Sequence, residues 1–442
     1  MKKKFCTVFI LLCLLGNSFS QNWQNVGQGF DIQTRYFWND TAANLLYCTG
    51  GFQHVENIPV NACAQWDGNS WDSIPNINYY GAMEIVRFNG DLYIAGYSHY
   101  ILHWNGIQID TIGNTYYGAV LKMYVFNNEL YAIGGFDSIN GLIVSDVAKY
   151  NGSAWSAIDT THWIGGAMYN ATFYQGNLYV SGNMTSSDGT IRSLAYWDGT
   201  QWHSVSNNAL YNGLGGVSCF AIYNNDLWIG GFFFQSMGNP YDCIARWNGS
   251  QFLDPGGGTN YPGQPFAMKV FNNELWMVGN FSTVAGIQSQ CVSKWNGTDW
   301  CSIGDTFSAA GVSDITVYDN ELYICGGFKT INSDTFNFIA KWIGGNYSDS
   351  CANTTGINEQ TQQNFSVNVF PNPVSENATF QFQGLDGNKT IIIYDQLGKE
   401  IWRKETNESQ IEFLAEDFSA GLYFYRVEQS GEIKTRGKFI IE

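Results

Sequence analysis

The sequence predicts an all-β protein, built from repeated four-stranded units and followed by a small β-sandwich. A segment of the type Phe126 to Phe136, Phe-Asn-Asn-Glu-Leu-Tyr-Ala-Ile-Gly-Gly-Phe, recurs along the chain. A fixed period of this size, with abundant glycine (49 of 442 residues) and only 13% charged residues, is typical of a repeat architecture of short strands and tight turns. The leucines that anchor the copies are Leu46, Leu92, Leu130, Leu178, Leu227, Leu275 and Leu322.

Each unit carries landmarks for four strands. The first strand ends in an aromatic residue before a turn such as Asn127-Asn128, and the second is the Leu-Tyr/Trp-x-x-Gly-Gly segment. The third strand runs into an aromatic residue before Asn-Gly or Asp-Gly, as in Trp295-Asn296-Gly297, which is a strong hairpin signal. The fourth begins at a further aromatic residue, such as Trp300. One such sheet cannot bury both its faces, so we expect the sheets to pack radially.

The last unit lacks a fourth strand after Trp342. The segment Trp23-Gln24-Asn25-Val26-Gly27 near the N-terminus matches Trp300 to Gly304, which opens a fourth strand. We therefore expect the N-terminal strand to complete the seventh unit and close the ring.

The second strand ending in Gly-Gly, the spaced Tyr or Trp and the following Trp resemble the kelch-type β-propeller, also seen in galactose-oxidase-like folds. The resemblance covers roughly Trp23 to Trp342, although the arginine-rich turn of kelch repeats is missing. It implies a seven-bladed β-propeller of four-stranded blades and is unspecific for activity.

The predicted domains are a signal peptide (1–20), a propeller (21–345), a linker (346–364) and a C-terminal domain (365–442). Lys2 to Lys4 followed by an apolar run to Leu15, with small residues at Ser18 and Ser20, predict secretion and cleavage before Gln21. The apolar run is too short for a stable anchor, and no later stretch predicts a transmembrane segment. Polar composition predicts the linker.

The C-terminal segment alternates apolar and polar residues between turn glycines, which predicts a small Ig-like β-sandwich. It resembles the C-terminal sorting domain of the type IX secretion system, with which it shares four motifs. These are Pro371-Asn372-Pro373, Ile393-Tyr394-Asp395-x-x-Gly398, Ala420-Gly421-Leu422-Tyr423 and Lys438-Phe439-Ile440-Ile441. The resemblance implies that the secretion machinery is a partner of residues 365–442 and that the product is extracellular or on the outer cell surface. An Ig-like adhesive module is the alternative.

Eight cysteines remain after the signal peptide. An even number in an exported protein permits disulfides. Cys48 with Cys63, and Cys291 with Cys301, are candidate pairs because their strands should be neighbours. Buried free thiols are the alternative.

The sequence predicts no catalytic residues, no cofactor and no metal site. Histidines are few (5), no Cys or His cluster has zinc-ligand spacing, and no nucleophile elbow or phosphate loop is present. Asp188-Gly189 and Asn332-Ser333-Asp334 could hold calcium, but turn formation explains them. The net charge of −17, with few basic residues in the repeats, argues against nucleic acid as a partner.

These features favour a secreted or cell-surface recognition module that binds a glycan or a protein. An extracellular enzyme acting on polysaccharide or peptide, with its site at the channel mouth, is the alternative, and a structural surface protein is a third reading. The loops that enter the first strands carry aromatic residues near glycines, and such side chains could form a ligand-binding ring around one channel mouth. The alternative is that they only pack between blades. The candidate residues are Tyr80, Tyr117, Trp163, Tyr211 and Tyr261.

Overall fold

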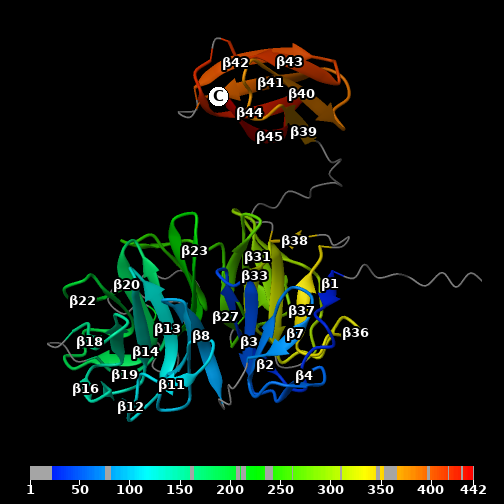
Figure 1. The fold of residues 1–442 in the computed structure, drawn as a ribbon. Coiled ribbons are helices and arrows are strands. Elements are labelled where there is room, and N and C mark those ends of the chain that lie inside the picture. The colour runs from blue at the N-terminus through cyan, green and yellow to red at the C-terminus, as the bar shows by residue number, and fades with distance from the viewer. Residues whose placement is uncertain are drawn as a thin grey trace, which may run out of the picture. The chain divides into compact units, whose positions relative to one another are not determined.

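The chain forms two compact units, Met1–Thr354 and Thr355–Glu442 (Figure 1). The computed structural model describes residues 22–74, 81–159, 164–205, 210, 216–233, 242–260, 262–308, 311–344, 349–352, 366–395, 399–416, 418–429 and 432–441. All regular structure in these ranges is β-strand, and none of it is helical. The predicted signal peptide lies outside them.

The described part of the first unit contains seven antiparallel sheets that share one plan of four strands in the order first, second, third and fourth, and one of these sheets has a fifth strand. The first strands are β2 (Thr34–Asp40), β8 (Ala82–Phe88), β13 (Val120–Phe126), β19 (Ile164–Tyr174), β23 (Val217–Tyr223), β27 (Gln264–Phe271) and β33 (Val312–Tyr318). The second strands are β3 (Leu45–Gly50), β9 (Asp91–Gly96), β14 (Glu129–Gly134), β20 (Asn177–Ser186), β24 (Asp226–Gly231), β28 (Glu274–Asn280) and β34 (Glu321–Gly326).

The outer half of each sheet holds the Trp-rich segments. The third strands are β6 (Cys63–Trp66), β10 (Leu102–Trp104), β17 (Val147–Tyr150), β21 (Arg192–Trp197), β25 (Ile244–Trp247), β31 (Val292–Trp295) and β37 (Ile339–Trp342). The fourth strands are β7 (Trp71–Ser73), β11 (Ile109–Thr111), β18 (Trp155–Ala157), β22 (Trp202–Ser204), β26 (Phe252–Leu253), β32 (Trp300–Ser302) and β1 (Trp23–Asn25).

The N-terminal strand β1 supplies the fourth strand of the last sheet. It pairs with β37, with Trp23 opposite Trp342. Trp23 is 1% exposed, its ring lies 4.9 Å from that of Trp342, and its indole N–H donates to the Asp305 carboxylate at 2.8 Å. The two ends of the repeat region are therefore joined within one sheet.

Turns of the Asn127-Asn128 type connect the first two strands, and both residues adopt positive φ (48° and 60°), as hairpin turns of this kind require. Glu129, which follows the turn, pairs with Lys149 of the third strand at 3.0 Å. The equivalent pairs are Asp91–His103, Asp226–Arg246, Glu274–Lys294 and Glu321–Lys341. The acidic residue of the repeat is therefore a cross-strand partner.

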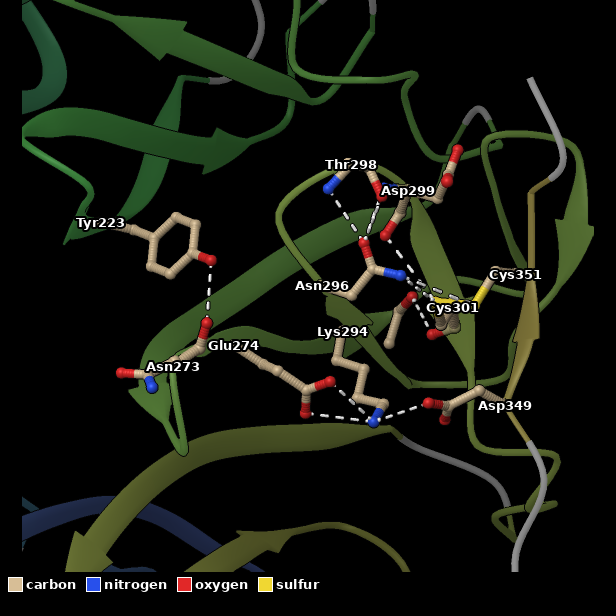
Figure 2. A network of polar contacts seen from close by, with 11 residues as sticks. Tyr223, Asn273, Glu274, Lys294, Asn296, Thr298, Asp299, Cys301, Asp349 and Cys351 are labelled. Carbon is tan, nitrogen blue, oxygen red and sulfur yellow. Dashed lines mark hydrogen bonds and ion pairs between the residues drawn. A yellow bond between two sulfur atoms is a disulfide. The ribbon is translucent and has the colours of Figure 1, made fainter. Parts of the chain in front are cut away.

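The turn between third and fourth strands differs from the turn between first and second strands. At Asn296-Gly297 only the glycine has positive φ (108°). The Asn296 side-chain oxygen accepts hydrogen bonds from the backbone N–H groups of Thr298 and Asp299, both at 2.9 Å (Figure 2). This is an Asx turn, which explains why Asp also serves at this position. The flanking Trp295 and Trp300 are both buried.

Short hairpins connect several second and third strands. They are β4 (His54–Val55) with β5 (Ile58–Pro59), β15 (Ser138–Ile139) with β16 (Leu142–Ile143), β29 (Thr283–Val284) with β30 (Ile287–Gln288), and β35 (Thr330–Ile331) with β36 (Asp334–Thr335). The loop entering the third sheet contains β12 (Thr115–Tyr116), which pairs with β15. Phe30, Thr259 and Phe307 make equivalent bridges. The two kinds of long loop therefore lie at the same end of the sheets.

Tyrosines at the ends of first strands connect neighbouring sheets. The Tyr223 hydroxyl donates to the carbonyl oxygen of Asn273, in the turn of the next sheet, at 2.8 Å (Figure 2). Tyr174 donates to Asn225 in the same way at 2.8 Å, and Tyr318 to Asn44 at 3.0 Å. The last of these bonds connects the seventh sheet to the first.

The predicted disulfides are wrong, because Cys48, Cys63 and Cys291 are free and buried. Cys48 lies opposite Ala64, whereas Cys63 lies opposite Thr49, so the two thiols occupy alternate faces of the sheet. Cys301 is instead bonded to Cys351, which lies in the segment predicted as linker.

Strand β38 (Ser350–Cys351) adds a fifth strand to the sixth sheet through β32. Beside it, the Lys294 ammonium contacts Asp349 at 2.9 Å and Glu274 at 3.0 Å (Figure 2). Lys294 is almost fully buried, so both carboxylates are needed close to its charge. The chain leaving the first unit is therefore held by a disulfide, a strand pairing and an ion pair.

A buried carboxyl group predicts pH-dependent stability. Asp146 is 3% exposed and accepts a hydrogen bond from the Phe136 N–H at 2.8 Å. Burial, with a contribution from the charge of Asp137, raises its pKa from 3.8 to about 8. A raised carboxyl pKa in the folded state means that stability falls as the pH rises from about 4 to about 8. This rise in pKa corresponds to about 6 kcal/mol.

Asp146→Asn should remove this dependence. Asparagine tolerates the positive φ of 62° at this position and keeps an oxygen that can accept the Phe136 N–H. In urea unfolding, the variant should match the wild type near pH 4 and be more stable by at least about 2 kcal/mol at pH 8. If the two proteins differ in unfolding free energy by the same amount at both pH values, folding does not raise the pKa of this carboxyl group.

The second unit consists of two antiparallel sheets around one apolar core. One contains β39 (Ser366–Phe370), β40 (Asn377–Gln383) and β43 (Gln410–Leu414), and the other contains β41 (Lys389–Tyr394), β42 (Glu400–Thr406), β44 (Gly421–Gln429) and β45 (Glu432–Ile441). The Asn372 side-chain oxygen accepts the Ile440 N–H at 2.9 Å. The first and last motifs of the predicted sorting domain therefore meet in space.

Candidate functional site

The first strands of the seven sheets surround a cavity of about 990 Å³. Successive first strands contact one another in chain order, and β33 contacts β2. Among the described residues the first strand of every sheet pairs only with the second, so no strand pairs with its other edge, although side chains contact some groups there, as Asp314 contacts the Phe37 N–H. Nearly all lining residues lie on these seven strands.

Each first strand contains a β-bulge in the same place. In β8, for example, the register shift lies between Ala82 and Glu84, and Met83 is the extra residue. A bulge redirects side chains, and here both the extra residue and the one after it line the cavity. The extra residues are Arg35, Met83, Leu121, Tyr169, Ser218, Phe266 and Ser313, and those that follow are Tyr36, Glu84, Lys122, Asn170, Cys219, Ala267 and Asp314.

The charged residues that line this cavity lie on β2, β8, β13, β27 and β33. Glu84 and Lys122, on neighbouring sheets, form an ion pair of 2.8 Å. Burial raises the pKa of Glu84, and the nearby ammonium of Lys122 offsets this rise only in part. Burial acts to lower the pKa of Lys122, but the Glu84 carboxylate outweighs this effect, so the pKa of Lys122 is raised. The pair is therefore a partly buried cross-sheet contact as well as part of the cavity wall.

Asp314 is the second acidic residue of the wall. Its carboxylate accepts the N–H of Phe37, in the next sheet, at 2.7 Å and the N–H of Ile315 at 2.8 Å. Burial raises its pKa to about 6, while these amides and Lys122 and Lys269 act to lower it. Asp314 therefore connects the seventh sheet to the first.

Neutral groups on β19, β23 and β27 also connect sheets. The Asn170 amide donates to the Ser218 carbonyl oxygen at 2.6 Å, and the Gln264 amide donates to the Ser218 hydroxyl at 2.6 Å. Cys219 is a buried free thiol, and burial raises its pKa. A thiol held in this form is a poor nucleophile.

Of the five predicted ligand-binding residues, Tyr80, Trp163, Tyr211 and Tyr261 lie outside the described residues. Tyr117 is described and is 76% exposed, with its ring 4.1 Å from that of Tyr116. It does not line the cavity. The predicted aromatic ring therefore stays a prediction.

Sequence reasoning missed the residues that follow the bulges. They always lie four residues before the last residue of the first strand, as Glu84 does before Phe88 and Lys122 before Phe126. A comparison of the units at this position would have revealed charged residues inside otherwise apolar strands.

The only cluster of metal-ligating side chains among the described residues is Cys301, Asp349 and Cys351. Its two thiols are joined in a disulfide, so the cluster offers no thiolate pair to a metal. The described residues also include no helix that could cross a membrane.

Residues 368–442 match the family of secretion system C-terminal sorting domains. The match covers the second unit and confirms the resemblance drawn from its four motifs. The chain thus carries the sorting tail of a type IX secretion cargo, through which it interacts with the secretion machinery, and its location is extracellular or on the cell surface. No curated protein matches the chain.

Solved structures with a similar fold share little sequence with this chain. One is PorZ, described as an essential bacterial surface component of the type IX secretion system of Porphyromonas gingivalis, with 14% identity and a TM-score of 0.43. The match covers 94% of this chain and 59% of PorZ, so the chain spans less than two thirds of that protein. An extracellular domain of a one-component system from B. thetaiotaomicron matches over 95% of this chain and 59% of its own, with 12% identity and a TM-score of 0.45.

The WD40 β-propeller domain of Doa1 is 9% identical with a TM-score of 0.47, and the match covers 72% of this chain and 96% of that domain.

Proposed function

We propose that the first unit is a closed, seven-bladed, kelch-like β-propeller that acts outside the cell as a recognition module. Its ligand, a glycan or a protein, binds in the cavity between the first strands. The second unit, which we propose to be an Ig-like β-sandwich, serves export.

One observation carries this proposal. Positions that build the sheets are nearly uniform along the chain, for example the buried leucines Leu46, Leu130 and Leu322. The positions around the bulges instead combine basic, acidic, aromatic and small side chains within one cavity of about 990 Å³. A uniform scaffold that presents varied side chains to a concave surface is typical of a binding site.

The proposed domain limits remain 21–345 for the propeller, 346–364 for the linker and 365–442 for the sorting domain. The linker would begin with a part held against the sixth sheet, because β38 and Cys351 are attached there. Ala352, which follows Cys351, is buried as well.

An extracellular enzyme is the second candidate. Two carboxyl groups with raised pKa values, Glu84 and Asp314, line the same cavity, and general acid catalysis uses such groups. Both are engaged by Lys122 or by backbone amides, which favours a structural role for them.

A glycan array and a panel of surface proteins, probed with the purified full-length chain, would test the recognition proposal. Hydrolysis of the bound compounds would be assayed in parallel. Saturable binding without turnover supports a recognition module, and turnover that is lost in Asp314→Asn supports the enzyme. Absence of both binding and turnover would contradict both.

A further inference from the structure

Basic side chains are scarce in the first unit, and most of those described pair with a carboxylate. The paired ones are Arg87, Lys122, Lys149, Arg246, Lys294 and Lys341. Arg35 and Lys269 differ, because neither has a hydrogen bond or an ion pair among the described residues. Both line the cavity. The cavity therefore contains two cationic groups whose charge no carboxylate contacts.

The acidic groups of the cavity cannot serve these two cations. The Glu84 carboxylate is taken by Lys122, with Nζ–O distances of 2.8 and 3.0 Å. The Asp314 carboxylate accepts two backbone N–H groups, and Lys269 acts on it only through space. Arg35 is partly buried and Lys269 is exposed at the cavity, and unpaired cations that line a concave surface attract an anion more strongly than they would on a flat one.

The other groups of the wall suit a sugar. Tyr169 is 50% exposed and Phe266 lines the same cavity, so aromatic faces are present onto which sugar rings can pack. Besides the groups that side chains already contact, such as the Phe37 N–H and the Ser218 carbonyl, the inner edges of the first strands present N–H and C=O groups, which match hydroxyl groups that donate and accept. An acidic peptide would match the cations but would use these aromatic faces less well.

We propose that the cavity binds a carboxylate-bearing oligosaccharide, with its carboxylates on Arg35 and Lys269 and its rings against Tyr169 and Phe266. The inference rests on the proposed function and specifies the ligand of that site. Arginine would bind a carboxylate through two parallel hydrogen bonds, and lysine as a point charge.

Isothermal titration of the purified full-length chain would test this with trimers of galacturonate, glucuronate and mannuronate. Their methyl esters, which have the same sugar without the charge, and triglutamate are the comparison ligands. At least one trimer should bind, and its methyl ester should bind at least about tenfold more weakly. Arg35→Gln and Lys269→Gln should each weaken the trimer by about tenfold or more, as expected for a lost charge-assisted hydrogen bond.

Lys329→Gln is the matched control. Among the described residues Lys329 also contacts no carboxylate, and its ammonium lies over the Phe338 ring at 5.5 Å, but it does not line the cavity. Its variant should bind the trimer as the wild type does.

Each other outcome overturns the inference. Equal binding of ester and acid would show that charge is not read, while recognition of a glycan stands. Stronger binding of triglutamate would indicate a peptide ligand, and an equal effect of Lys329→Gln would indicate nonspecific charge. If no trimer binds, the proposed ligand class is wrong. If the glycan array and the protein panel also show no binding, the proposed function fails as well.

Discussion

Removal of residues 22–27, which include β1, should separate the two ends of the repeat region and cause the shortened protein to aggregate. The deletion exposes the edge of β37 along its whole length, and an exposed strand edge pairs with other chains. It also removes Trp23, which is 1% exposed and packs on Trp342. Loss of a buried aromatic side chain alone costs about 3–5 kcal/mol. Size-exclusion chromatography and thermal unfolding would measure the effect.

A matched control uses the same strand. Gln24 and Asn25 are exposed, so their replacement by alanine keeps the pairing with β37 and should leave the melting temperature within about 2 °C. A monomeric deletion variant with an unchanged melting temperature would show that β1 does not hold the ring closed.

Deletion of residues 366–442 should abolish display on the cell surface while the first unit stays folded. The deleted segment contains the residues that match the sorting domain family. It has a core of its own, in which Phe380, Phe413 and Phe439 pack edge to face, so the first unit loses no core residue. Antibody labelling of intact cells would measure display, and thermal unfolding of the purified variant would measure its fold.

Lys399→Ala, in the turn between β41 and β42, is the control for this deletion. The Lys399 side chain is exposed, and the backbone N–H that donates to Asp395 at 2.9 Å is kept. Display of this variant should be normal. If the deletion variant is also displayed normally, the tail has no sorting role in this protein.

Local sequence chemistry explains why the sheets could be predicted. Asn127-Asn128 adopts the positive φ values that its turn needs, and Trp295 and Trp300 are buried on the strands where their spacing places them. The match of Trp23 to Trp300 indicated the partner of β37, because both open a fourth strand of the same kind.

The cavity and the disulfide could not be predicted, because they depend on contacts between distant residues. A bulge adds one residue to a strand and leaves no mark in the residue types around it. The alternation of apolar and polar residues in β8 therefore does not show that Glu84 lies beside Lys122. Cys351 meets Cys301 only because the chain returns to the sixth sheet after β37. Glu129 was recognised as part of the repeat, but its ion pair with Lys149 requires the strand register.

Filling the cavity tests most directly whether it is the recognition site. Ser313 is the extra residue of the bulge in β33 and lines the cavity. Ser313→Trp would occupy part of that space, whereas Ser313→Ala leaves it open. Both variants would be measured by titration with the ligand that gives the strongest array signal, and by thermal unfolding. The account predicts that Ser313→Trp weakens binding at least about tenfold, a loss of about 1.4 kcal/mol, at a melting temperature close to that of Ser313→Ala. Unchanged affinity in a folded Ser313→Trp variant would contradict it.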